Sequence, residues 1–590
     1  MDAAYHAQVD ARIGQVVEVM SQDARSTWDG HALVANGKDD ERLSRILEEG
    51  LGHPTPGPAP RISSGTFEII TAITILLRAE DRLAPGAVEH VRHVITEGIL
   101  HRDNTENHWL MHYTTLLLAA ERWPETQRWG NGLTTAAVHA EARRWILGMI
   151  ERTARFGHHE YDSPIYHILH MACMTALADH AHELHVRQQA QNVLALFVAD
   201  LALENFHGTW AGGHSREGDR QNTWTYPGSI AGLQYIYFGG DFDPLVHCDG
   251  RLGPVLSSAY RPPRVFAEMA NDRTRAHVVR KTKAPRAILR HSQREAAPVR
   301  KYTYMSPSFA LGSTQVGLPG PPAGPIDLVS WDLTWQGPRH QAKIVSNHPF
   351  RSSGRMSAFL SETPQTVGTL VGRAKPHLMT DDRFCGGSPY EQMLQHEGTV
   401  ILLYRIPETD DCRFVNLYLP QSINWVQRAG WILGSTGDFH IAVRPFGSCI
   451  WDALHDQQVD GWMVRLKGPD TGLVLETVEA LQMGFAAFCD ARVAAAVDLS
   501  GWPQDNRVAV ATTSGDSLQM EYGNGPDRQP GVHLVNGERV DYESYALYDA
   551  PGVAAPVNTG RMHFISGDAS LTLDFGIDPA STPIPMRVIG

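Results

Sequence analysis

The order of apolar and polar positions divides the chain into two parts. Over the first 240 residues, apolar side chains recur at the spacing of amphipathic helices, in residues 67–77, 109–120, 136–150, 165–177 and 193–203. Short breaks rich in Gly, Pro and Asp separate these runs, among them GHPTPGPAP and HHEYDSP. The pattern predicts a succession of helical hairpins, which pack as a bundle, a solenoid or a closed toroid.

From about residue 300 the pattern changes to short runs such as DLVSWDLTW, TVILLYRI and FVNLYLP. β-branched and aromatic residues are frequent and turn residues bound each run, which is typical of strands in an antiparallel sandwich. Alternation is imperfect in TVILLYRI, because Ile401 and Leu403 are apolar on the face opposite Val400, Leu402 and Tyr404. We nevertheless expect strands here, since β-branched and aromatic residues are enriched and turns are frequent.

The chain has 590 residues, which is more than one ordinary core supports. We therefore expect a multidomain protein with a helical domain over residues 1–260, a basic junction over 261–301 and an antiparallel β-sandwich over 302–590. The junction carries 12 Lys or Arg and 3 acidic residues. We interpret it as a solvated linker, or as a charged segment that attracts an anionic ligand into a cleft between the domains.

The charge and hydropathy of the whole chain exclude two classes of partner. A formal net charge of −14 argues against a nucleic-acid binder, because such proteins concentrate positive charge on one face. No apolar run approaches the roughly 20 residues that span a bilayer, and FEIITAITILL, which ends at Arg78, is predicted to be a buried helix. The start, MDAAYHAQVDARIGQ, has no apolar run, so a cytoplasmic protein is the default expectation, or a secreted one if a leader was removed.

The first candidate site lies in HRDNTENHWLMHY, residues 101–113. Asn104 and Thr105 are suitable N-cap residues for the helix that follows. Capping does not explain the adjacent Asn107 and His108, whose amide and imidazole can donate hydrogen bonds to one carboxylate. His112 lies one turn after His108, but two imidazoles at this spacing do not make a metal site without a third ligand.

The second candidate site lies in HHEYDSPIYHILH, residues 158–170. Pro164 ends a turn there, and Tyr166 and His167 are expected in the first turn of the next helix. A tyrosine in such a place is either a half-buried anchor or a catalytic group.

The third candidate site lies in WAGGHSREGDRQNTWTYPG, residues 210–228. Two glycines allow the backbone to approach a ligand closely, and the segment presents His214, Arg216, Arg220 and Tyr226 nearby. Loops with this mixture of residues frequently carry function.

This organisation resembles the heparinase II/III and alginate-lyase type of polysaccharide lyase, in which an adjacent Asn and His neutralise the substrate carboxylate and a later Tyr transfers the proton. The resemblance implies an N-terminal (α/α) toroid as the catalytic domain, with Asn107 and His108 as neutralisers. Tyr166, 58 positions after His108, is then the acid and base. The basic residue that precedes the family tyrosine has no counterpart in EYDSPIY.

The resemblance also implies residues outside the three segments. A sandwich-domain histidine is expected, for which His340 and His348 are the candidates. Some members carry a metal, so a structural or catalytic Zn²⁺ or Ca²⁺ stays open, although the spacing assigns no ligands to it. The six cysteines lie singly, without the close pairs of a zinc knuckle, and are expected to be free thiols.

The chemistry of β-elimination fits these residue types. Removing the proton next to a uronate carboxylate creates a dianion, and each well-placed donor to it is worth a few kcal/mol. A tyrosine has a pKa near 10, so it needs cationic neighbours such as Arg216, Arg220 or a protonated histidine to act as a base. His214 and His167 are the alternative groups for sharing the proton transfer, and His214 is counted among the catalytic residues. We expect the anionic sugar to contact a set of seven residues: Arg216, Arg220, Tyr226, Trp109, Trp210, Glu106 and His167.

Two other functions remain open at this point. The first is a glycoside hydrolase of the toroid type, which would use Glu106 with Glu160 or Asp162 as its pair of carboxylates. The second is a non-catalytic carbohydrate-binding protein, in which Trp109, Trp210 and Trp224 would form stacking platforms. The expected partner is an anionic poly- or oligosaccharide, with no nucleic acid and no membrane, and a homo-oligomer stays open.

Overall fold

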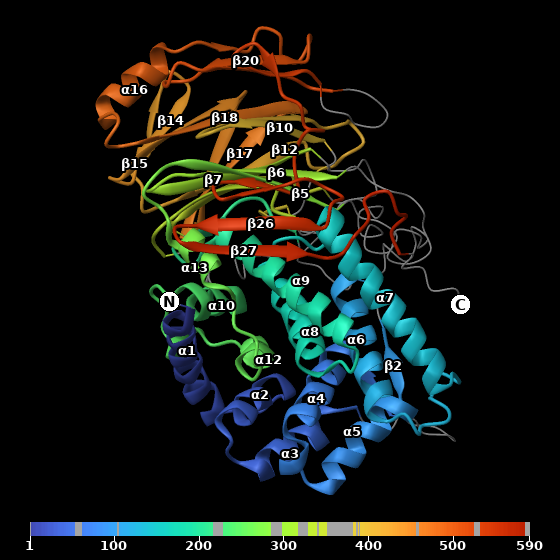
Figure 1. Ribbon diagram of the computed structural model, residues 1–590. Helices are drawn as coiled ribbons and strands as arrows, with labels where there is room; N and C mark the ends of the chain where they lie inside the picture. Colours follow the sequence, from blue (N-terminus) through green and yellow to red (C-terminus); the bar gives the residue numbers. More distant parts are fainter. Residues whose placement is uncertain are drawn as a thin grey trace.

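The computed structural model describes residues 2–52, 62–102, 105–215, 228–284, 298–316, 328–338, 341–350, 381–384, 388, 390–455, 460–523 and 531–584. Helices fill the first half of the chain and antiparallel strands the second, so the predicted change from helices to strands is confirmed. Figure 1 shows the helices gathered at one end of the molecule and the sheets at the other.

The helical part begins at Asp2 and its last long helix ends at Asn271. Its main helices are α1 (Asp2–Gln22), α2 (Thr27–Asn36), α3 (Asp40–Gly50), α4 (Thr66–Ala79), α5 (Pro85–Glu97), α6 (Glu106–Arg122), α7 (Thr135–Phe156), α8 (His167–His180), α9 (Leu184–Leu203), α10 (Gly228–Phe238), α12 (Gly253–Leu256) and α13 (Arg264–Asn271). Helix α6 packs on α7 and α8 on α9, as expected for hairpins, while α2, α4, α6 and α8 contact one another in chain order. Helix α12 contacts both α8 and α2.

The apolar run that ends before Arg78 forms α4, and its residues from Ile69 to Leu76 are buried. The prediction of a buried helix is therefore confirmed. Among the described residues, no helix has the length and the apolar character needed to cross a bilayer.

The strands described in the structure form one sheet of twelve strands, two smaller sheets of six and five strands, and two short pairs, β1 (Ser63–Gly65) with β2 (Ile99–His101) and β3 (Asn205–Phe206) with β4 (Thr209–Trp210). The large sheet has the order β16-β17-β12-β9-β8-β7-β6-β5-β24-β25-β26-β27, from β16 (Cys449–His455), β17 (Asp460–Lys467), β12 (Phe414–Pro420), β9 (Lys343–Asn347), β8 (Trp331–Trp335), β7 (Phe309–Val316), β6 (Val299–Met305), β5 (His277–Lys283), β24 (Tyr548–Ala550), β25 (Val553–Ala555), β26 (Arg561–Ser566) and β27 (Ala569–Asp574). Figure 1 shows that β26 and β27 lie on the side of the helices.

The second and third sheets complete the layers. The second has the order β10-β11-β18-β15-β14-β13, from β10 (Glu391–His396), β11 (Thr399–Arg405), β18 (Asp470–Glu479), β15 (Phe439–Phe446), β14 (Trp431–Ser435) and β13 (Val426–Arg428). The third contains β19 (Val497–Asp498), β20 (Arg507–Ala511), β21 (Ser517–Glu521), β22 (His533–Val535) and β23 (Glu538–Arg539), and helix α16 (Phe485–Ala494) precedes it. In Figure 1, β20 and α16 are farthest from the helices.

Strand β11 explains the imperfect alternation in TVILLYRI, because both of its faces are buried. Val400, Leu402 and Tyr404 belong to the core that the second sheet shares with the large sheet. Ile401 and Leu403 belong to a separate core, closed by α16 and the third sheet. A strand in a middle layer has no solvated face, so it does not need polar residues on alternate positions.

The predicted basic junction supplies two strands of the large sheet. Lys281 and Lys283 lie on β5 and Lys301 on β6, and all three side chains are at most 1% exposed. The interpretation as a solvated linker is therefore wrong for these lysines. The alternative, an attraction for an anionic ligand, is also wrong for them, because their charges meet carboxylates of the protein itself.

Those carboxylates come from the helical part. Lys301 forms ion pairs with Asp162 and, at 2.8 Å, with Glu204, while Lys283 reaches Asp200 at 2.6 Å. Burial alone would raise the pKa of Asp162, but the three lysines hold it well below its ordinary value. Three carboxylates and three ammonium groups thus form a buried, neutral network that joins the helices to the large sheet.

Candidate active site

The first two predicted segments meet through a reciprocal pair of glutamates. The Glu106 carboxylate, at the start of α6, accepts the backbone N–H groups of His159 at 3.2 Å and of Glu160 at 2.8 Å. Glu160 Oε2 in turn accepts the backbone N–H of Asn107 at 3.0 Å and its side-chain Nδ2–H at 2.6 Å. These four bonds fasten the start of α6 to the loop that leads into α8.

The third predicted segment joins the same place. The backbone N–H and the hydroxyl of Ser215 donate to the carbonyl of Tyr161 at 3.1 and 2.9 Å. One residue earlier, His214 exchanges two backbone hydrogen bonds with Val329, next to the large sheet. The structure therefore brings residues 105–108, 158–170 and 211–215 together where the helices meet the sheet.

The glycines of the third segment serve the fold rather than a ligand. Gly212 has a φ of +90°, and a Cβ atom there would lie 2.7 Å from Thr303 Oγ1. A Cβ atom on Gly213 would lie 2.6 Å from the carbonyl oxygen of Ser330. The backbone at these glycines does approach another group closely, as expected, but that group belongs to the large sheet and its neighbouring loop rather than to a ligand.

The two residues predicted to neutralise the substrate carboxylate differ in their exposure to solvent. His108 is half-buried; its Nδ1 lies 2.6 Å from Thr105 Oγ1, and its ring packs edge-on against Phe67. Asn107 is fully buried, and its Nδ2 group donates to Glu160 and, at 3.0 Å, to Thr105. The expectation that Asn107 donates to a substrate carboxylate does not hold in this structure, because both of its amide hydrogens are already used.

Thr105 occupies the predicted N-cap position of α6 but makes no capping hydrogen bond with its side chain. Its hydroxyl instead fixes His108 and Asn107. The other expected cap residue, Asn104, lies outside the described residues.

Tyr166 is the N-cap residue of α8, one position before the helix that it was expected to begin. Its backbone N–H donates to Ser163 Oγ at 3.0 Å, and its carbonyl accepts a hydrogen bond from His170 Nδ1 at 3.0 Å. The residue is half-buried and packs against the hydrophobic core. His108 and Tyr166 are thus the partly exposed members of the predicted set beside the buried glutamate pair.

All four described residues that were expected to contact the sugar are buried: Glu106, Trp109, His167 and Trp210. Trp109 is 1% exposed and packs against Trp145, and Trp210 is 5% exposed with its edge toward His167. The His167 ring nitrogen Nε2 lies 3.1 Å from the Phe197 carbonyl, and burial holds the pKa of His167 well below its usual range. These side chains have no free face for a sugar ring, so the prediction of stacking platforms at Trp109 and Trp210 is wrong.

Two histidines that were not singled out from the sequence lie next to the glutamate pair. His170 Nε2 lies 3.6 Å from Glu106 Oε2, and the ring of His158 is centred 5.4 Å from that of His170. Burial alone would raise the pKa of Glu106. His170 and His158 lower it by more than burial raises it, so the net shift is downward. His170 follows Tyr166 by one helical turn, which is the sequence signal that could have identified it.

Several predicted residues lie outside the described parts of the chain: Arg216, Arg220, Trp224, Tyr226 and His340. The other sandwich-domain candidate, His348, is fully buried, with its ring nitrogens 2.9 Å from Ser388 Oγ and 2.8 Å from the Cys412 carbonyl. His112 lines a separate pocket of about 620 Å³, together with residues such as Ile95 and Glu141, and burial there lowers its pKa to about 3.

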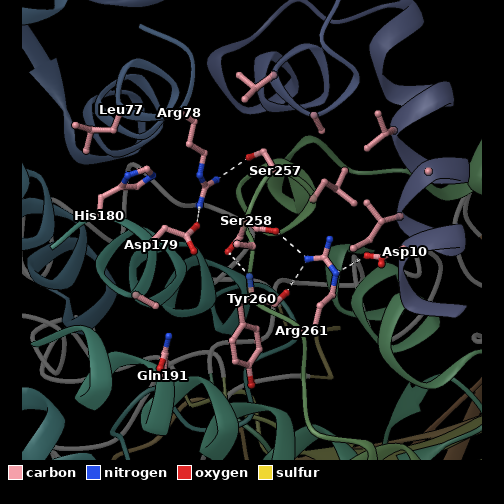
Figure 2. Close-up of a pocket in the computed structure, with 18 residues that line it drawn as sticks. Asp10, Leu77, Arg78, Asp179, His180, Gln191, Ser257, Ser258, Tyr260 and Arg261 are labelled. Carbon is pink, nitrogen blue, oxygen red and sulfur yellow. Dashed lines mark hydrogen bonds and ion pairs between the residues drawn. The ribbon is translucent and has the colours of Figure 1, made fainter. Parts of the chain in front are cut away.

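A larger cavity of about 860 Å³ lies at the opposite end of α8 (Figure 2). Arg78 donates to Asp179 and to Ser257, both at 2.6 Å, and on the other side Arg261 donates to Asp10 at 2.6 Å. The cavity lies beside Asp179 at the end of α8, whereas Tyr166 precedes its first turn. At 1.5 Å per residue, that separation is on the order of 20 Å. The two places are therefore distinct.

Comparison with known proteins adds no family to this picture, because no protein-family model and no curated protein sequence matches the chain. The function must therefore be inferred from the site. A half-buried imidazole and a phenol, beside the starts of two helices, can bind an anion and transfer a proton.

Proposed function

We propose that the chain is a lyase that cleaves a uronic-acid-containing poly- or oligosaccharide by β-elimination. The observation that carries this proposal is the convergence of the three segments around the Glu106–Glu160 pair. That pair holds the start of α6, which bears His108, against the loop that ends in Tyr166. These are two of the residue types that elimination requires, on neighbouring rigid supports.

The charge distribution supports an anionic substrate. The start of α6 already binds the Glu160 carboxylate through Asn107, so the start of α8, beside Tyr166, is the helix N-terminus whose partial positive charge favours a substrate carboxylate. In the proposed reaction, His108 donates to the uronate carboxylate while the Tyr166 phenolate removes the adjacent ring proton. The same phenol then protonates the leaving oxygen. Arg216 and Arg220 remain our candidates for the cations beside the phenol.

Asn107 takes a different role in this proposal from the one that the family resemblance implies. Its amide holds Glu160, and Glu160 fixes the backbone of the segment that carries His108. We therefore assign Asn107 to positioning, and His108 and Tyr166 to direct contact with the sugar.

We also propose that the helical part is an (α/α) toroid and that the first two sheets form the sandwich of such a lyase. The chain-order contacts of α2, α4, α6 and α8 support this, as does α12, which contacts both α8 and α2 and so closes a ring. The core shared by the large and second sheets supports the sandwich.

The two alternatives have less support. A hydrolase needs a carboxylic acid that can donate a proton, but the pKa values of Glu106 and Asp162 are both lowered. All three candidate carboxylates, Glu106, Glu160 and Asp162, are also buried in protein contacts. A binding protein with tryptophan platforms is weakened by the burial of Trp109 and Trp210.

The decisive assay offers a panel of uronate-containing polysaccharides and oligosaccharides and follows ultraviolet absorbance, because elimination leaves a conjugated double bond whereas hydrolysis does not. We expect absorbance to rise with at least one substrate and to stay flat with Tyr166→Phe. A matched control is Tyr235→Phe, whose hydroxyl contacts Gln15 on another part of the helices. Full activity in Tyr166→Phe would refute the catalytic assignment, and reducing ends formed without absorbance would indicate a hydrolase.

A further inference from the structure

Glu106, Glu160 and His170 lie around one point inside the protein. Each offers one ligand atom, and these atoms all lie within 4.8 Å of one another. They come from the start of α6, from the loop before α8 and from α8 itself, and all three residues are at most 6% exposed. A buried group of two carboxylates and one imidazole requires a compensating charge.

The imidazole of His170 has an unusual hydrogen-bonding state. Its Nδ1 is 3.0 Å from the Tyr166 carbonyl, which only an N–H can satisfy, so Nδ1 carries a hydrogen. The other nitrogen, Nε2, is buried without a hydrogen-bond partner and faces Glu106 Oε2 at 3.6 Å. Burial lowers the pKa of His170, but Glu106 raises it by more, so without a cation the protonated ring faces Glu106 as an ion pair. A metal ligand must be the neutral ring, in which Nε2 is an acceptor, and two acceptors then face each other across this gap.

That gap has the size expected for two ligands of one metal ion. A distance of 3.6 Å is too long for a hydrogen bond. Two ligand atoms that each lie about 2.1 Å from a tetrahedral metal are separated by about 3.4 Å. The buried oxygen Oδ1 of Asn107 and both ring nitrogens of His158 also lack hydrogen-bond partners, which is a second sign of an unassigned polar ligand in this place.

We propose that Glu106, Glu160 and His170 bind one divalent transition-metal ion, with Asn107 Oδ1 and His158 as the nearest further donors. One imidazole with two carboxylates suits Zn²⁺ better than Ca²⁺ or Mg²⁺, which prefer ligand sets made only of oxygen. With His170 neutral, two carboxylates carry the charge that one divalent ion balances.

The surrounding hydrogen bonds orient the three proposed ligands, as they do in metal sites. Backbone N–H groups of His159, Glu160 and Asn107 orient the two carboxylates, and the Tyr166 carbonyl fixes the tautomer of His170. The ion would join the segments that carry His108 and Tyr166. The proposal concerns metal binding alone, so it stands whether or not the chain is a lyase.

The test uses the chain of 590 residues, dialysed against a chelator and then titrated with Zn²⁺. We expect one equivalent to remain bound after gel filtration, measured by elemental analysis, and to raise the unfolding temperature. His170→Gln and Glu160→Gln should weaken binding by at least about 100-fold, more than the 10- to 100-fold typical of residues that only support a ligand. The matched control is His180→Gln, at the other end of α8, which should bind as the unchanged protein does.

The proposal is overturned if the unchanged protein retains no tightly bound Zn²⁺, or if the two variants, folded by circular dichroism, bind it equally well. Should either variant fail to fold, X-ray absorption on the unchanged protein decides. A shell of nitrogen and oxygen at about 2.0–2.2 Å supports the site, whereas sulfur ligands or water alone contradict it.

Discussion

Replacing Asp162 by Asn tests the buried charge network that joins the helices to the large sheet. The Asp162 carboxylate forms ion pairs with Lys301 and with two lysines of β5, at 2.9 Å for Lys281 and 3.2 Å for Lys283. None of these side chains is more than 1% exposed. The substitution keeps the shape of the side chain but leaves two carboxylates against three ammonium groups.

The expected loss of unfolding free energy is large, because one lysine ammonium group is left without a carboxylate partner while it remains buried. Removing one partner of a buried ion pair costs about 3–5 kcal/mol of unfolding free energy. The matched control is Asp574→Asn, which removes a pair with Arg561 at 2.7 Å, where the side chains are 47% and 71% exposed. An exposed pair of this kind contributes about 0–1 kcal/mol.

Urea unfolding at pH 7, read at the first transition, measures both losses. Because the pKa of Asp162 is lowered in the folded state, its contribution is complete above its unfolded pKa of about 3.9 and is lost as the pH falls below that value. The difference between the unchanged protein and Asp162→Asn should therefore shrink in acid.

Two results would refute this reasoning. The first is a loss in Asp162→Asn that lies within about 1 kcal/mol of the Asp574→Asn control. The second is a double variant, Asp162→Asn with Lys301→Met, that is no more stable than the single one, because removing the unmatched ammonium should restore part of the loss.

Three further predictions follow from single contacts. Gly212→Ala should destabilise the protein by about 1–3 kcal/mol in urea unfolding, because its φ of +90° strains alanine and the Cβ would meet Thr303; no loss would contradict the contact. Burial lowers the pKa of His533 to about 4, so its contribution to stability is complete above about pH 6.5 and is lost as the pH falls toward 4. Across that window the protein should lose about 3 kcal/mol more than His533→Gln, and equal losses would contradict the shift. On a lyase substrate, His108→Ala should lower kcat by about 10²- to 10³-fold, and an unchanged kcat would remove His108 from the site.

The layers of the fold could be predicted only in part from the sequence. Helical spacing and short turn-bounded runs separate the two halves, because each follows from the local geometry of the backbone. The double-sided apolar pattern of Ile401 and Leu403 is visible in the sequence, but its cause is not. The residues that cover this face, such as Trp502 and Leu518, lie about a hundred positions later.

The buried charges show why counting basic residues misleads. Lys281 and Lys301 resemble the solvated lysines of a linker, because their partner Asp162 lies 119 and 139 positions away. A local signal did exist on the acidic side. Asp200 and Glu204 are spaced by four in the otherwise apolar run VLALFVADLALE, where an unpaired carboxylate could not be buried.

The candidate site was located by its unusual residues, but their contacts could not be predicted. Glu106 looks like an ordinary acidic residue in the first turn of a helix, and its exchange of hydrogen bonds with Glu160 links positions more than fifty apart. Trp109 looks like a sugar platform in the sequence, but the packing of α6 on α7 buries it. Local patterns identify residue types, whereas tertiary packing decides which side chains remain accessible.

The central claim is that His108 and Tyr166 meet one sugar acid. A crystal structure of Tyr166→Phe soaked with a uronate oligosaccharide that the unchanged protein cleaves tests it directly. We predict the uronate carboxylate within about 3 Å of the His108 ring. The sugar proton next to that carboxylate should face position 166. A sugar bound in the cavity beside Arg78, or on the sheets away from His108, would contradict the account.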